Sequence, residues 1–136
     1  MSAVVPDTLE VKVLNSFIVN GLSLRLFGNN KTPAHGDSVA SYTEIVGGGY
    51  TAKALTFGNF TVTSGDPSSA IYNTAQVWEF TGVVNAPGTV YGYYLVRTSD
   101  NQLILAERFP VGSLPFVPKA GSKITILPKV TAQSEF

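Results

Sequence analysis

The sequence predicts an all-β fold: a two-sheet antiparallel sandwich, jelly-roll-like, with about eight strands in a single domain over residues 1–136. Strand-forming Val, Thr, Tyr, Phe and Ile are abundant, and no segment keeps helical hydrophobic spacing for three turns. Glycine and proline recur at short intervals, as expected of a chain that turns about every ten residues. The pattern does not determine the order of the strands.

The first two confident strands follow from alternation of apolar and polar residues. Residues 22–27 (LSLRLF) alternate three leucines with a serine and an arginine, and the turn-rich stretch GNNKTPAHGD ends this strand. Residues 76–81 (QVWEFT) place Trp78 and Phe80 on one side, which is expected to face the core. Weaker strands are predicted near residues 11–18, 50–55 and 60–63.

The segment 89–98 (TVYGYYLVRT) is apolar on both faces, so it is expected to be a central strand or to lie beneath an interface. Simple alternation places Val90, Tyr94 and Val96 on one face and Tyr91, Tyr93 and Leu95 on the other. Residues 99–102 (SDNQ) form a loop of turn-forming residues, and residues 103–109 (LILAERF) form the returning arm of a predicted hairpin.

A late strand is predicted over residues 122–131 (SKITILPKVT), with Ile124 and Ile126 on one face. Pro128 lacks the N–H that a sheet ladder needs, which favours an edge or a bulge at that position. The ends of the domain, near residues 1–8 and 132–136, are expected to be flexible.

Charge and cysteine content restrict the possible functions. Nine basic and nine acidic side chains cancel, and the charged fraction of 13% is about half the usual quarter of a soluble domain. No nucleic-acid partner is expected, and a surface with so little charge favours association with other protein surfaces. The chain has no cysteine, which excludes disulfides, thiolate metal sites and a cysteine nucleophile.

The start of the chain, MSAVVPDTLEV, lacks the basic and apolar regions of a secretory signal peptide. No apolar run approaches the roughly 18 residues that span a bilayer. The expectation is a protein made in the cytoplasm, with no membrane partner.

The glycine triplet 47–49 beside Lys53 raises the question of a phosphate site. A phosphate cradle needs a strand, a glycine-rich turn and a helix, with Lys and Ser or Thr at fixed offsets. The residues after Gly49 read as extended chain, and Lys53 is isolated. The triplet therefore predicts positive φ angles and a close approach to neighbouring backbone.

Candidate catalytic and metal-binding residues are few. His35 is the only histidine, and a serine triad with Asp37 and Ser38 or Ser41 can be drawn. The turn chemistry favours another reading, in which Asp37 caps backbone amides and His35 points into solvent. Zinc lacks enough ligands, and the turn aspartates lack the alternation of a calcium loop. We expect no enzyme, no cofactor, no metal and no small-molecule substrate.

Tyr91, Tyr93 and Tyr94 are the residues that a stacking platform for sugars or bases would use. A row of strand tyrosines more commonly belongs to a core and an interface. Nucleic-acid binding is disfavoured further because no basic stripe accompanies the rings.

The segments LRLFGNNKTPAHGDSVASYTEIVGGGY, WEFTG, VYGYYLV and LILAERF together resemble small virion proteins of tailed bacteriophages, particularly cyanophage-like heads. The resemblance covers residues 22–109, with its motifs at 26–30, 42–50 and 106–109. It implies a head decoration (cement) protein: a β-sandwich on the outer capsid surface that trimerises over local threefold axes and bridges neighbouring major capsid protein subunits.

The partner interface is expected to involve residues 1–8, the turn around residues 29–37 and the proline-flanked segment 114–118, through Val4, Val5, Pro6, Asn29, Asn30, Leu114, Phe116 and Val117. A terminal arm of this kind can add a strand to a neighbour's sheet edge. The segment 114–118 is equally compatible with a loop packed on its own domain. An alternative function is a phage tail, baseplate or fibre module that binds a host glycan through its tyrosines.

Overall fold

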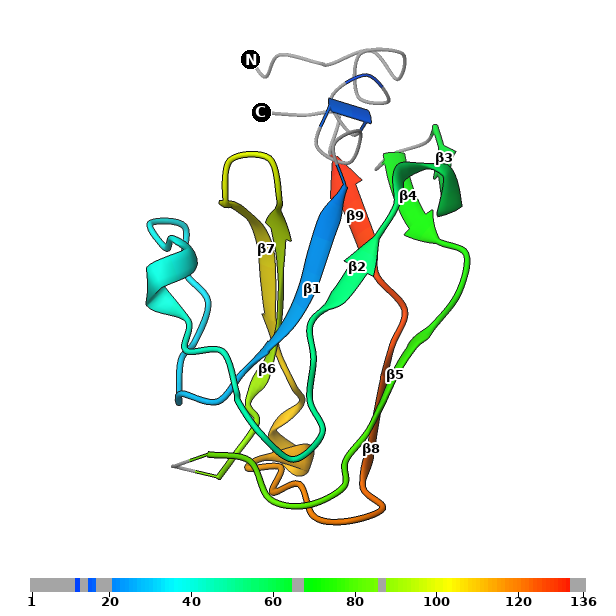
Figure 1. Ribbon diagram of the computed structural model, residues 1–136. Coiled ribbons are helices and arrows are strands. Elements are labelled where there is room, and N and C mark those ends of the chain that lie inside the picture. The colour runs from blue at the N-terminus through cyan, green and yellow to red at the C-terminus, as the bar shows by residue number, and fades with distance from the viewer. Residues whose placement is uncertain (1–11, 13–14, 17–20, 65–67, 86–87, 133–136) are drawn as a thin grey trace.

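The computed structural model describes residues 12, 15–16, 21–64, 68–85 and 88–132 (Figure 1). The described residues form nine strands, all paired antiparallel, and three 3₁₀ helices. The strands are β1 (Leu22–Phe27), β2 (Lys53–Leu55), β3 (Phe60–Thr63), β4 (Ser68–Tyr72), β5 (Gln76–Glu79), β6 (Gly92–Arg97), β7 (Gln102–Arg108), β8 (Lys123–Ile126) and β9 (Lys129–Ala132). The 3₁₀ helices are η1 (Val39–Ser41), η2 (Phe57–Asn59) and η3 (Val111–Ser113).

The strands build three sheets, which confirms the all-β, antiparallel prediction. The largest has the order β2-β1-β6-β7, the second β3-β4-β9, and the third consists of β5 and β8. The described strands do not close into a barrel.

The second and third sheets continue into one another as a long pair of chains. Ile71 on β4 lies opposite Lys129 on β9, and a few residues further on Gln76 lies opposite Ile126. Between these pairs the Tyr72 N–H donates to the Pro128 carbonyl at 2.9 Å. The predicted strand over 122–131 is thus two strands interrupted at Pro128, and the second, β9, is an edge strand, as the proline indicated.

A large apolar cluster, here called the inner core, joins one face of the four-stranded sheet to the other two sheets. Its buried side chains come from β1, β2, β3, β4, β5, β6, β8 and β9. The three leucines of β1 are almost completely buried, which confirms the alternation predicted for 22–27. Trp78 and Phe80 are also in this core, as predicted, and the Trp78 indole N–H donates to the Thr51 carbonyl at 2.7 Å.

The opposite face of the four-stranded sheet carries a second, smaller cluster, here called the outer cluster. Phe27, Tyr42, Tyr94 and Val96 form it. The Tyr42 ring stacks on Tyr94 with centroids 5.3 Å apart and meets Phe27 edge to face at 4.9 Å. Because β6 lies between β1 and β7 and is covered on both faces, its prediction as a central strand is confirmed.

The predicted division of side chains between the two faces of segment 89–98 is wrong before Gly92, where β6 begins. Val90 packs in the inner core with Leu95, whereas Tyr91 packs against the outer cluster with Tyr94. The alternation changes at Gly92, where a Cβ would lie 2.6 Å from the Phe27 ring and would also collide with the Glu107 carbonyl. Glycine at this position allows the strand to pass close to both neighbours.

The β6–β7 hairpin is present as predicted, and its turn is closed by an ion pair between Arg97 and Asp100 at 2.7 Å. Its register shifts once, because Leu95 pairs with Leu105 and Val96 with Leu103. Ile104 is therefore an extra residue in a β-bulge, and β7 is regular only beyond it, from Leu105 to Arg108.

Other predictions have mixed outcomes. The strand near 60–63 corresponds to β3, and the strand near 50–55 is shortened to β2. The strand near 11–18 lies mostly outside the described residues, and the described Lys12, Asn15 and Ser16 have helical backbone. β4 was not predicted, because its sequence SSAIY has little contrast between its faces. The predicted flexible ends lie outside the described residues, except that Ala132 ends β9.

Candidate interaction surface

Loops from three parts of the chain meet at one end of the molecule, seen at the bottom of Figure 1. We call this the loop end and define it as residues 44–50, 80–85, 88–90 and 110–118. The Asn85 N–H donates to the Val46 carbonyl at 2.8 Å, and the Thr81 N–H donates to Gly48 at 2.9 Å. Val90 and Phe116 exchange two backbone hydrogen bonds, which joins the third loop to the others.

The glycine triplet holds two of these loops together. Gly47, Gly48 and Gly49 all have positive φ, at 89°, 62° and 81°. A Cβ on Gly48 would lie 2.7 Å from the Gly82 carbonyl oxygen, so only glycine permits this approach. This confirms the prediction of left-handed backbone and close contact, and no helix follows the triplet before β2.

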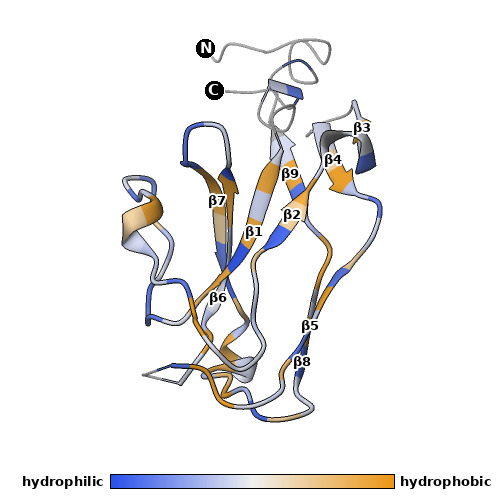
Figure 2. Cartoon of the chain, in the orientation of Figure 1, coloured by the Kyte–Doolittle hydropathy of each residue, from blue (hydrophilic) through white to orange (hydrophobic). Residues whose placement is uncertain are grey.

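The loop end presents exposed apolar side chains, and Glu44 is its only charged residue. Val46 is 63% exposed, Val83 71%, Val111 87% and Val117 56%. Residues 45–50, 80–85 and 109–118 contain no Asp, Glu, Lys, Arg or His. Figure 2 shows hydrophobic colour recurring along these loops. Because the supporting backbone is hydrogen-bonded, the surface is preorganised for contact with another uncharged surface.

The proline-flanked segment divides into a buried and an exposed part. Phe116 is half-buried and packs against the inner core, with its ring 6.2 Å from that of Phe80. Leu114 is half-buried as well, whereas Val117 is exposed. A charged substitution at Phe116 would disturb the fold, so Val117 is the residue of this segment through which contact can be tested.

The two predicted asparagines also differ from each other. The Asn29 side chain donates to the Ser41 carbonyl at 3.1 Å and accepts from the Thr43 N–H at 2.9 Å, so it ties the turn to its own chain. Asn30 is exposed. Both line a hollow of about 330 Å³ that also includes Asn85 and lies beside the loop end. The predicted interface residues Val4, Val5 and Pro6 lie outside the described residues.

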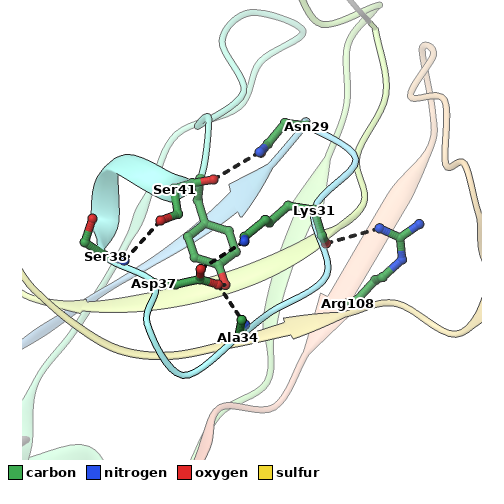
Figure 3. A network of polar contacts seen from close by, with 8 residues as sticks. Asn29, Lys31, Ala34, Asp37, Ser38, Ser41 and Arg108 are labelled. Carbon is green, nitrogen blue, oxygen red and sulfur yellow. Dashed lines mark hydrogen bonds and ion pairs between the residues drawn. The ribbon is translucent and has the colours of Figure 1, made fainter.

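The segment 28–44 leaves the sheet after β1 and folds over the outer cluster; we call it the excursion. Its shape depends on Asp37, whose carboxylate accepts hydrogen bonds from the Tyr42 hydroxyl at 2.7 Å and the Ala34 N–H at 2.8 Å (Figure 3). Lys31 lies 2.9 Å from the same carboxylate. The hydrogen bond from Tyr42, followed by the Lys31 ammonium and the Ala34 amide, lowers the pKa of Asp37 from its usual 3.8 to about 2.

The histidine has the environment expected of a turn residue. His35 is exposed, and within the described residues no hydrogen bond joins it to Asp37, Ser38 or Ser41. The Asp37 carboxylate caps the Ala34 amide, as the turn chemistry indicated. The described residues also contain no group of three or more His, Asp or Glu side chains positioned to hold a metal ion.

Tyr93 and Tyr94 on β6, together with Tyr91 just before it, do not form one stacking platform. Tyr94 is buried in the outer cluster, and Tyr93 lies on the inner face, where its hydroxyl donates to Glu107 at 2.7 Å. Tyr91 is half-buried, with the Arg108 guanidinium 5.0 Å from its ring centroid. Tyr91 and Tyr94 therefore share the outer face and Tyr93 lies on the inner face, although a period of two had put Tyr91 and Tyr93 on the same face.

Sequence reasoning missed Val46, Val83 and Val111, the most exposed apolar residues of the loop end. A signal was present, since three long uncharged segments each contain a valine flanked by glycine or proline. Only the structure shows that these segments share one end of the molecule.

No family model, curated protein or solved structure matches the chain. Among the helices that the structure describes, none has the length and apolar composition needed to cross a lipid bilayer.

Proposed function

We propose that this protein is a structural virion component, a decoration or cement protein that binds the outer surface of a tailed-phage head and bridges neighbouring major capsid protein subunits, as a homotrimer. In this proposal the four-stranded sheet is one layer of a jelly-roll-like sandwich. The other two sheets, which continue into one another, are the second layer. The protein is made in the host cytoplasm, and it acts by contact, without catalysis or a cofactor. The resemblance over residues 22–109 motivates this proposal.

The observation that carries the proposal is the loop end. Four exposed valines on hydrogen-bonded loops, whose only charged residue is Glu44, suit burial against another protein better than contact with water. Such a patch contributes little binding free energy per copy. Repetition over a symmetric shell makes the summed contacts strong, because all of them must break together.

The alternative, a tail or baseplate module that binds a host glycan, has less support. Its main motive was a tyrosine platform, but Tyr93 lies on the opposite face of the four-stranded sheet from Tyr91 and Tyr94, and Tyr94 is buried. A glycan module would occur in a few copies per particle, whereas a cement protein occurs in numbers comparable with the major capsid protein.

The deciding experiment counts copies in purified virions by densitometry against the major capsid protein. We expect a copy number comparable with that of the capsid protein, which would support the cement role. A few copies located on the tail would contradict it.

The surface is tested with a charge placed on the loop end. We expect Val83→Asp to keep its fold and to lose loading onto heads that lack the protein, because burying an unpaired carboxylate is unfavourable. Val77→Asp is the matched control, since Val77 is exposed on β5, outside the loop end. Equal loading of Val83→Asp and the parent would refute the loop-end assignment.

A further inference from the structure

The described four-stranded sheet ends in β2 on one side and in β7 on the other, and β7 is the longer of these two edge strands. Among the described strands β7 pairs only with β6, and its residues Leu103, Ile104, Leu105 and Ala106 are half-buried. The Phe109 N–H donates to the Tyr91 carbonyl at 2.9 Å. From this pair to Leu105, β7 pairs with β6 without a shift in register. In an antiparallel ladder successive residues bond to opposite sides, so Ala106 and Arg108 direct their backbone groups away from β6.

This edge lies between two hollows, one on each face of the sheet. The first, of about 500 Å³, lies between β7 and the excursion, with Pro33 and His35 in its wall. The second, of about 470 Å³, lies between β7 and Val130 of β9. Ile104, Leu105 and Ala106 line both. Alternate side chains of a strand added to β7 would point to opposite faces and would enter the two hollows in turn.

We propose that residues 3–5 (Ala-Val-Val) of a second copy of this chain add a strand to the edge of β7 over residues 105–108. The backbone groups of Ala106 and Arg108 supply the ladder, and the small apolar side chains of the arm occupy the two hollows. The inference rests on the homo-oligomer of the proposed function but not on its capsid role.

The composition of the arm fits this edge. Val4 and Val5 are strand formers of a size that suits half-buried hollows, and Pro6 ends the run. Residues 1–11 contain two acidic residues and no Lys or Arg. At the edge, Arg108 and Lys129 form no ion pair with a carboxylate among the described residues. Eleven extended residues reach about 36 Å, enough to cross to a neighbouring copy.

The start of β1 lies at the end of the sheet away from the regular half of β7. The described chain enters β1 at Leu22, opposite Arg97, whereas the regular half of β7 lies beside the start of β6 at Gly92. The chain's own arm would have to run back along the sheet for about 20 Å, the length of the six residues of β6, which is within its reach, so it is the homo-oligomer of the proposed function that favours a neighbour's arm. Because the arm and the edge are different surfaces, their exchange is heterologous, and it closes into a ring such as a trimer when the rotation permits.

The test uses disulfide crosslinking in this cysteine-free, full-length chain. One preparation carries Val4→Cys and another Ala106→Cys, and the two are mixed, allowed to exchange and oxidised. We expect a crosslinked two-chain band on a non-reducing gel, several-fold more intense than in a mixture of Val4→Cys with Val83→Cys. Val83 is the control because it is exposed at the loop end. Val4→Asp should lose the oligomer in light scattering while keeping the parent's circular dichroism spectrum.

Four outcomes would overturn the assignment. The first is a crosslinked two-chain band no stronger than the band with the Val83→Cys control. The second is a preparation of Ala106→Cys alone that crosslinks as efficiently as the mixture. The third is a Val4→Asp protein that remains oligomeric. The fourth is a double Val4→Cys/Ala106→Cys chain that crosslinks only within itself. Virion copy number is measured separately, so failure of this contact is distinguishable from failure of the capsid role.

Discussion

The two faces of the four-stranded sheet are both apolar, yet they are covered in different ways. The inner face is buried by strands from the other two sheets. The outer face is buried by a single excursion, residues 28–44, which is held in place by hydrogen bonds around Asp37. The stability of the inner face therefore depends on buried apolar area, whereas that of the outer face depends on a few aromatic rings held in place by the Asp37 carboxylate. Substitutions should therefore act differently on the two faces.

The largest effect is expected on the inner face, from Trp78→Ala. Removing this side chain, 3% exposed, leaves a cavity and an unpaired Thr51 carbonyl. The expected loss in the free energy of unfolding is about 3–5 kcal/mol. Urea denaturation measures it, with Val77→Ala on the same strand as the control, where a change within about 0.5 kcal/mol is expected. If both variants melt alike, Trp78 does not anchor the inner core.

The next largest loss of stability is expected at Gly92, where the alternation of side chains between the two faces changes. A methyl group there would collide with the Phe27 ring and the Glu107 carbonyl, so Gly92→Ala should lose about 1–3 kcal/mol of stability. Gly112→Ala is the matched control, because a Cβ on Gly112 meets nothing within 4 Å. A Gly92→Ala protein as stable as the control would show that the change of alternation does not need a glycine.

On the outer face, Tyr42→Phe removes the hydroxyl that donates to Asp37 and keeps the ring stacked on Tyr94. We expect a loss of about 1 kcal/mol, measured by urea denaturation at pH 7. Tyr93→Phe serves as a comparison, because the hydrogen bond from Tyr93 to Glu107 is exposed and should contribute less. An unchanged midpoint for Tyr42→Phe would mean that rings alone hold the excursion.

The last variant, Asp37→Asn, keeps an amide oxygen that can accept bonds from Tyr42 and Ala34 but loses the negative charge that faces Lys31, so at neutral pH it loses the part of the parent's stability that depends on the ionised carboxylate. Its signature is the pH dependence. The pKa of Asp37 is lowered from 3.8 to about 2 in the folded protein, so the carboxylate stabilises the fold above about pH 4. That stabilisation is lost as the pH falls from 4 toward 2.

Asp37→Asn should flatten the decline in stability over this range, followed by urea denaturation between pH 2 and 5. The pKa of Asp100 is also lowered, by its hydrogen bonds with Arg97, so Asp100→Asn is the control that separates the two contributions. A variant that retains the parent's full acid sensitivity would rule out Asp37 as the origin.

The outer face also shows where sequence-based inference ends. Alternation identified β1 and β5, because a period of two with one buried face is a local signal, and the turn-forming residues between two apolar segments identified the β6–β7 hairpin. It failed at Gly92 and did not detect the bulge at Ile104, since both depend on what the neighbouring strands allow. For the same reason Phe116, which reads as an exposed docking residue, packs against the core.

The sequence by itself determined the antiparallel all-β character, the central position of the doubly apolar strand, and the need for glycine at positions 47–49, because strand alternation and positive φ are properties of single segments. The tertiary structure alone decided that three loops with little charge share one end, that the excursion covers the second face, and that β7 is an edge of the described sheet and lies between two hollows. These features arise from contacts between segments distant in the chain, and no local pattern of residues encodes such a contact.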